Sequence, residues 1–83
     1  MYYVYVLKSG LDGNQYIGYT TDLRKRIRRH QNGEVPSTKS RLPFELVFYE
    51  SYKAMADAKR REKYLKTSKG KSSLRLMLRN SLE

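Results

Sequence analysis

The chain of 83 residues contains no cysteine, which excludes disulfide bonds and thiolate-bound zinc. No apolar run approaches the length of a transmembrane helix, and the N-terminus lacks the cationic, apolar and small-residue order of a signal peptide. We therefore expect one small cytoplasmic domain, residues 1–83. Acidic residues number only eight and are spread along the chain, which argues against a two-metal site built on a carboxylate cluster.

Positive charge, by contrast, is abundant. Eighteen lysines and arginines give a formal net charge of +10. Such a field attracts polyanions, because neutralising their phosphates releases condensed counterions. Nucleic acid is therefore the expected partner. An anionic membrane is disfavoured, since no predicted helix pairs a basic face with large exposed apolar anchors. Charge alone does not separate a nuclease from a ribosome-associated protein.

The first twenty residues predict a β-hairpin. Residues 2–8 are aromatic and β-branched, which is typical of a strand buried on both faces or nearly so. A segment rich in turn-forming residues separates them from residues 15–20, which predict the returning strand. With the turn centred near residues 10–11, Tyr5 lies opposite or nearly opposite Tyr16, and both side chains point to the same face.

A strongly basic helix is predicted to follow the hairpin. Thr20, Thr21 and Asp22 offer an N-cap, and Asp22 also suits the positive end of the helix. Leu23 and Ile27 form an apolar stripe at i and i+4. Arg26 and His30 border this stripe, so we expect them beside the buried face of the helix rather than opposite it.

Residues 44–52 predict the third strand, which follows a polar loop at residues 34–43. Strict alternation would place Phe44, Leu46 and Phe48 on one face of that strand. The serine, threonine, lysine and arginine side chains of the loop could reach a phosphate backbone.

The last part of the chain predicts two helices. Residues 53–66 suit a helix whose inward face carries Glu62, and residues 73–82 suit a closing helix. Residues 68–73, with Gly70, are expected to be a short basic linker between them. The element order β-β-α-β-α-α predicts an α+β fold, with a three-stranded, mainly antiparallel sheet flanked by helices.

Each of the first two predicted strands contains a tyrosine-bearing triplet of residues. Tyr3-Val4-Tyr5 lies in the first strand and Tyr16-Ile17-Gly18 in the second, directly before the basic helix, and the run AKRREKYLK follows later. This order resembles the GIY-YIG nuclease superfamily over nearly the whole chain. It is most similar to small stand-alone members that resemble the N-terminal nuclease domain of the bacterial excinuclease, so we expect no attached DNA-targeting domain. One departure is that the first triplet begins with Tyr3 rather than glycine.

The resemblance implies a metal-dependent endonuclease that hydrolyses phosphodiester bonds, in DNA more than in RNA, in repair or recombination. The site residues that it implies are Tyr5, Tyr16, Arg26, His30 and Glu62. Glu62 matches the family's metal-binding glutamate and would hold one Mg²⁺ or Mn²⁺ together with water and a substrate phosphate.

Each of these side chains has a part in that chemistry. The arginine would present a planar cation to the phosphoryl oxygens. Either tyrosine could accept the proton of the attacking water, because the arginine, the metal and the positive field all favour a phenolate. The histidine could relay that proton or hydrogen-bond a tyrosine or a phosphate.

Every site residue also has an ordinary structural explanation. The tyrosines could be packed strand residues, among eight in the chain, and the arginine could belong to a solvated basic face. The histidine could complement the helix dipole, and Glu62 could pair with Lys59 or Lys66. Their joint occurrence in family order favours one shared site. The alternative function is a non-catalytic nucleic-acid-binding module that retains the nuclease fold. Because so small a chain contacts few base pairs, useful specificity would need a dimer or a protein partner.

Overall fold

The computed structural model describes all 83 residues. It contains three strands, three α-helices and one 3₁₀ turn, in the order β1 (Tyr2–Ser9), β2 (Gln15–Thr20), α1 (Leu23–Gln31), η1 (Lys39–Arg41), β3 (Phe44–Tyr52), α2 (Met55–Leu65) and α3 (Ser68–Met77). The predicted α+β fold and its element order are confirmed. None of the helices combines the length and the apolar character needed to cross a membrane.

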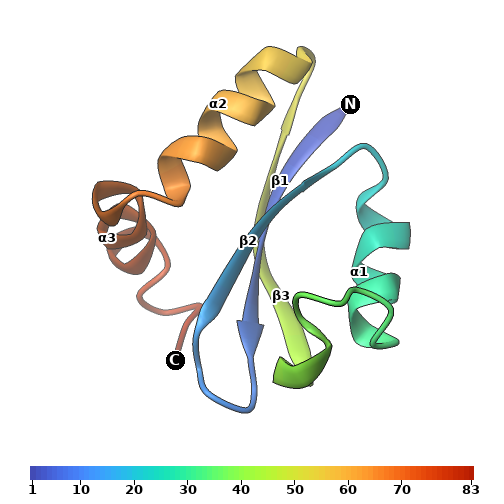
Figure 1. The fold of residues 1–83 in the computed structure, drawn as a ribbon. Coiled ribbons are helices and arrows are strands. Elements are labelled where there is room, and N and C mark those ends of the chain that lie inside the picture. Colours follow the sequence, from blue (N-terminus) through green and yellow to red (C-terminus); the bar gives the residue numbers. More distant parts are fainter.

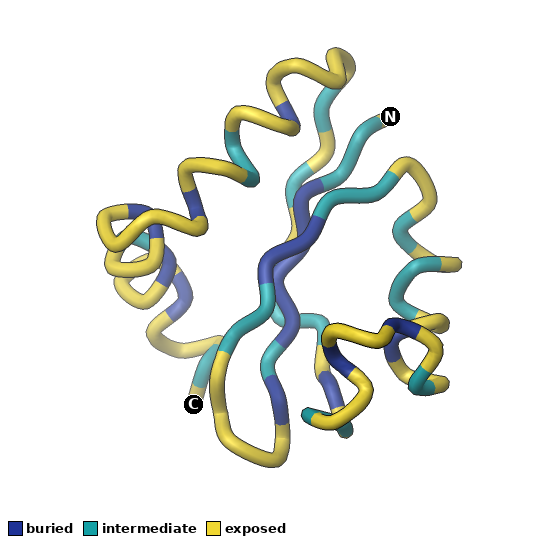
Figure 2. Tube along the Cα trace, viewed as in Figure 1, coloured by how far each residue is buried: buried dark blue, intermediate teal, exposed yellow.

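The sheet is antiparallel throughout, with the strand order β2-β1-β3. Because β1 is the central strand, both of its faces are covered, which explains its aromatic and β-branched sequence. Helix α1 and the loop after it lie on one face of the sheet, whereas α2 and α3 lie on the other (Figure 1). The deepest burial follows β1 and the adjoining part of β2, between these two layers (Figure 2).

The register of the hairpin differs from the expected one. Tyr5 pairs with Gly18, and Tyr16 pairs with Leu7. Tyr5 and Tyr16 are therefore nearly opposite, as diagonal neighbours, rather than directly paired. The turn is centred one residue further along, and its Gly13 adopts a positive φ of 74°. Moving the centre by one residue moves every partner by two, so the two tyrosine side chains still share a face.

The alternation along β3 is interrupted by a β-bulge. Val6 pairs with Phe48, but its neighbour Leu7 pairs with Leu46, so Val47 is the additional residue. Leu46 accordingly packs on the α1 side, whereas Phe48 packs into the core on the α2 and α3 side. The prediction that Phe44, Leu46 and Phe48 share one face is wrong for this reason.

The segment expected to be a linker is the first part of α3. The helix begins at Ser68, and the hydroxyl of Thr67 caps it by accepting a hydrogen bond from the amide of Gly70 at 3.1 Å. A Cβ atom at Gly70 would lie 2.6 Å from Leu65 Cα and would overlap the carbonyl oxygen of Tyr64. Gly70 therefore permits the backbones of α2 and α3 to touch, and it does not end a helix.

Candidate active site beneath helix α1

Three buried side chains form a continuous hydrogen-bonded chain on the α1 face of the sheet. Tyr5 comes from β1, His30 from the last turn of α1 and Thr38 from the following loop, and none of the three is exposed to solvent. The Tyr5 hydroxyl lies 2.8 Å from His30 Nε2, and His30 Nδ1 lies 2.8 Å from the Thr38 hydroxyl. The sequence therefore brings Tyr5 and His30 into contact, as the positions of the two residues predicted.

Neighbouring groups fix the direction of these hydrogen bonds. Arg26 donates from Nε to the Tyr5 hydroxyl at 3.3 Å, and Thr38 donates to the carbonyl oxygen of Val35 at 3.4 Å. Tyr5 is therefore free to donate its own proton to Nε2, while Thr38 accepts from the N–H at Nδ1. We assign His30 as a neutral imidazole with its proton on Nδ1.

The electrostatics of the site agree with a neutral histidine. Burial lowers the pKa of His30 from 6.5 to about 4, since it disfavours the imidazolium, and the nearby cations of Arg26 and Arg29 act in the same direction. His30 is thus uncharged at neutral pH. Its Nε2 lone pair can accept a proton.

Tyr5 behaves differently from the expectation of a stabilised phenolate. Burial raises the pKa of Tyr5 above its usual value of 10.0, and this effect outweighs the hydrogen bond from Arg26, which lowers the pKa. In the free protein Tyr5 is a protonated phenol. It can act on a water molecule only while its own proton is passed on.

The second triplet contributes the aromatic ring of Tyr16 and, at Gly18, the room that the Tyr5 ring occupies. Tyr16 is half-buried, and its ring centroid lies 6.3 Å from that of Tyr5 and 5.2 Å from that of His30. Gly18 lies directly beneath the Tyr5 ring, where a Cβ atom would overlap Tyr5 Cζ and the hydroxyl oxygen. Glycine is needed at this position because the buried phenol occupies the volume of a side chain.

Glu62 lies apart from the other four predicted site residues, Tyr5, Tyr16, Arg26 and His30. It is half-buried on α2 and accepts a hydrogen bond from Lys66 at 3.0 Å, one helical turn away, but it makes no hydrogen bond to the other four residues. Its charge is among the influences that raise the pKa of Tyr5, after burial and a smaller contribution from Tyr16. The ordinary pairing that we considered for Glu62 is thus present, and the carboxylate still acts electrostatically on the candidate site.

The donor set bears on whether a metal ion could be held here. No group of three or more histidine, cysteine, aspartate or glutamate side chains comes together anywhere in the structure. A hard divalent cation at Glu62 would have one protein carboxylate and would take its remaining ligands from water and a phosphate. That donor set fits Mg²⁺ or Mn²⁺ held mainly in the presence of substrate.

Thr38 was not singled out from the sequence. The loop was expected to be polar and accessible, yet Thr38 is fully buried in it. A threonine in a polar loop gives no signal of its own. The useful signal would have been the histidine, since a buried imidazole needs a partner for each nitrogen.

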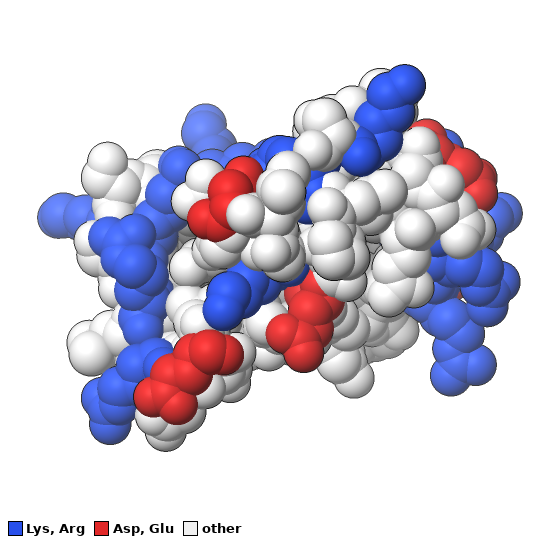
Figure 3. All heavy atoms as spheres, turned by 90° about the horizontal axis from the view of Figure 1, so that it is seen from below, with Lys and Arg blue, Asp and Glu red and all other residues white.

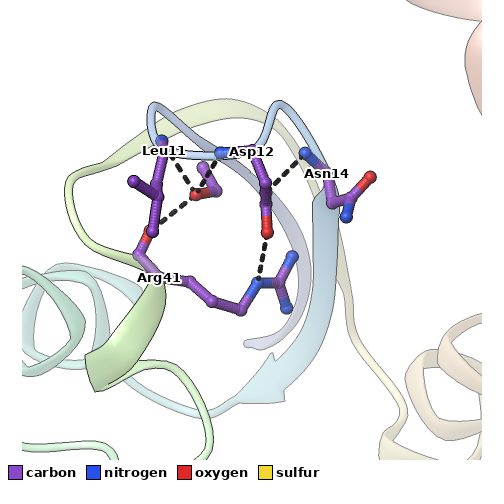
Figure 4. A network of polar contacts seen from close by, with 5 residues as sticks. Leu11, Asp12, Asn14 and Arg41 are labelled. Atoms are coloured by element: carbon purple, nitrogen blue, oxygen red, sulfur yellow. Dashed lines mark hydrogen bonds and ion pairs between the residues drawn. The ribbon is translucent and has the colours of Figure 1, made fainter.

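The loop that carries Thr38 is tied to the turn of the β1–β2 hairpin. The guanidinium of Arg41 lies 3.5 Å from the carboxylate of Asp12 (Figure 4). Ser9 donates from its hydroxyl to the carbonyl oxygen of Arg41 at 2.6 Å and accepts the backbone N–H of Leu11 at 3.1 Å. Both ends of the Tyr5–His30–Thr38 chain are thereby held by the same hairpin.

Positive charge surrounds the site without covering the whole surface. Seen from the end of the molecule that carries the hairpin turn, lysine and arginine side chains lie towards both the α1 side and the α3 side, with acidic side chains among them (Figure 3). A depression beside α1 contains Lys25, Arg26 and Arg29 together with Tyr19 and Thr20. Three cations around one concave surface suit a phosphate-bearing ligand.

Comparison with known proteins gives a consistent result. A family model described as the GIY-YIG catalytic domain matches residues 1–75. A UPF0213 protein of Staphylococcus saprophyticus is 38% identical over 77 residues, which cover 92% of this chain and 93% of that protein. UPF0213 proteins of Staphylococcus epidermidis and Staphylococcus aureus are 36% identical with the same coverage. No solved structure matches.

Proposed function

Since the chain belongs to the GIY-YIG catalytic domain family, which implies a nuclease-type function, we propose that it is an endonuclease that hydrolyses phosphodiester bonds in DNA, in repair or recombination. The observation that supports this proposal best is the hydrogen-bonded series Arg26–Tyr5–His30. It links a phosphate-binding cation to a hydroxyl and a proton acceptor within one small site. A buried structural tyrosine would need only one partner for its hydroxyl, whereas this hydroxyl joins a cation to a proton acceptor.

Arg26 is suited to hold the scissile phosphate. Its Nε is engaged by Tyr5, and no carboxylate pairs with its two terminal nitrogens. These nitrogens can donate to two phosphoryl oxygens while Nε keeps its contact. Charge that develops on the phosphoryl oxygens in the transition state is thereby stabilised next to the general base.

The proton of the attacking water passes to Tyr5 as Tyr5 gives its own proton to His30 Nε2. This transfer avoids a free phenolate, which burial disfavours. Bound phosphate offsets the positive charge of Arg26, one of the groups that lower the pKa of His30, and so makes the imidazole a better acceptor. We assign the role of general base to Tyr5 rather than Tyr16 because the Tyr5 hydroxyl forms hydrogen bonds with both Arg26 and His30.

Glu62 is the proposed ligand of one Mg²⁺ or Mn²⁺, since nucleases of this family generally use divalent metal ions. When bound, the ion would act as a Lewis acid on the phosphate. The pairing of Glu62 with Lys66 does not prevent this role. Lys66 is 54% exposed, and pairs of this kind one helical turn apart contribute only about 0.3–0.5 kcal/mol.

The test is cleavage of nicked, flapped and single-stranded DNA in Mg²⁺ or Mn²⁺ by the wild type and four variants. We expect Glu62→Ala and Tyr5→Phe to lose cleavage while keeping fold and DNA binding. Tyr16→Phe is expected to retain more activity than Tyr5→Phe. Lys66→Ala, which removes the partner of Glu62, is the matched control and should cleave at least as well as the wild type. Cleavage by Glu62→Ala at the wild-type rate would refute the assigned metal ligand.

A non-catalytic nucleic-acid-binding module is the second candidate. It is favoured by the net charge of +10 and by Tyr3 at the first position of the first triplet, where the family has glycine. It predicts salt-sensitive binding without a metal requirement and without product on any of the three substrates.

A further inference from the structure

A groove of about 660 Å³ lies on the side of α1 that faces β3. Its apolar lining comes from five side chains: Tyr3, Leu23, Ile27, Leu46 and Tyr49. Tyr49 is 52% exposed, and its ring centroid lies 6.2 Å from that of Tyr3 with the planes inclined by 59°. The groove thus presents an accessible aromatic face on an edge strand of the sheet.

Cations border this groove from the helix. Arg24 and Arg28 are both exposed, lie one helical turn apart and have no acidic partner. The one acidic residue of the groove, Asp22, uses its carboxylate to accept the amide hydrogen of Lys25 at 3.1 Å. The groove therefore combines an aromatic floor with a rim of net positive charge.

The groove adjoins the depression that contains Arg26. Both are lined by Thr21 and Asp22, at the start of α1. Successive helical residues are separated by about 100°, so Arg24 and Arg26 lie on opposite sides of the helix. A chain of phosphates that passes over the start of α1 would meet Arg26 on one side and Arg24 on the other.

From this geometry we propose that the groove binds an unpaired nucleotide of a single strand. A base stacks on the Tyr49 ring, and Arg24 and Arg28 hold the neighbouring phosphates. Paired bases are already stacked within a duplex, so only an unpaired base can use the aromatic surface. This inference rests on the proposed function in that both take nucleic acid as the partner, but it needs neither metal nor cleavage.

Fluorescence anisotropy in EDTA tests the proposal, with a labelled oligothymidylate and a labelled blunt duplex as the two probes. Tyr49→Ala should bind the oligothymidylate about tenfold more weakly, within the range typical of base–aromatic stacking, and should bind the duplex as the wild type does. Tyr64→Ala is the matched control, because Tyr64 is 40% exposed on α2, across the sheet. Tyr49→Phe keeps the ring and should restore the affinity.

A second pair of variants tests the cations. Arg24→Ala with Arg28→Ala should weaken binding of the oligothymidylate and reduce its salt dependence. Lys69→Ala with Lys71→Ala removes the same charge from exposed positions on α3 and should do neither to the same extent.

The outcomes separate this inference from the proposed nuclease. Unchanged affinity of Tyr49→Ala for the oligothymidylate, or equal weakening for the duplex, would refute nucleotide binding in the groove. Neither result would bear on the proposed active site. Selective weakening in a protein that cleaves nothing would support the groove and refute the nuclease.

Discussion

The two faces of one small sheet are built on opposite principles. On the α2 and α3 side the core cluster is entirely apolar, formed by Val4, Val6, Ile17, Ala58, Leu65, Leu74 and Leu78. On the α1 side the apolar cluster has only three buried members, and the buried volume is shared with His30, Thr38 and Ser9. Alternate side chains of β1 supply both faces. One strand thus serves stability in one direction and polar chemistry in the other.

The polar face is stable only because its hydrogen bonds are complete. No buried side-chain nitrogen or oxygen in the structure lacks a partner. A buried polar group without a partner costs about 1–3 kcal/mol, so each missing hydrogen bond on the α1 side would lower the free energy of unfolding by a similar amount. The comparison therefore predicts that changes on the apolar face alter stability alone, whereas changes on the polar face alter both stability and the state of the site.

Leu65→Ala should produce the largest loss of stability. Leu65 is fully buried where α2 meets the sheet and α3, and such a truncation typically costs about 2–5 kcal/mol. Chemical denaturation would measure the loss. The ring signals of Tyr5 and His30 should stay unchanged in the NMR spectrum of the folded fraction. If those signals moved as far as they do in a variant of the α1 face, the two faces would not be independent.

The pH dependence of stability should depend strongly on His30. The unfolded histidine takes up a proton below pH 6.5, whereas the folded one does so only near 4, so acid favours the unfolded chain. This group contributes about 3 kcal/mol at neutral pH, which is lost as the pH falls from 6.5 to 4.

His30→Gln isolates this contribution, because the carboxylates titrate in both proteins. Between pH 7 and 4 the free energy of unfolding of the wild type should fall by about 3 kcal/mol more than that of the variant. Parallel stability curves would mean that His30 is not buried as a neutral side chain.

Only part of this two-sided architecture could be predicted from the sequence. Periodicity predicted the strands and the first two helices, because a repeat of two or of 3.6 depends on local geometry alone. It placed the last helix at residues 73–82 instead of Ser68–Met77, and it put His30 at the edge of the buried face although the side chain is fully buried. It could not supply the bulge at Val47 or the role of Gly70. Both are set by contacts with other elements of the fold, and a glycine in a helix looks like a helix end until the second helix is seen.

Gly18→Ala should have a smaller effect on stability and a large one on the site. The new methyl group would meet the Tyr5 ring and force it from its hydrogen bonds, at a cost of about 1–3 kcal/mol. The loss of the His30 contact would appear as a changed pKa of His30 in an NMR titration. Gly70→Ala is the matched control on the other face: it crowds the backbones of α2 and α3 and should destabilise the fold without moving the pKa of His30.

Thr38→Val should have the smallest effect on stability and a specific one on the histidine. Valine preserves the shape of the side chain but removes the acceptor of the Nδ1 proton, at a cost of about 1 kcal/mol. With that acceptor gone, the proton gains by moving to Nε2, where it can donate to the Tyr5 hydroxyl. The Nε2 lone pair would then no longer be available to Tyr5. The ¹⁵N shifts of the two ring nitrogens report this exchange directly, and cleavage should fall with it. Thr38→Ser restores the hydroxyl and should restore both readouts. If Thr38→Val kept the wild-type nitrogen shifts, the threonine would be a packing residue, and the tautomer of His30 would be fixed by Tyr5 and Arg26 alone.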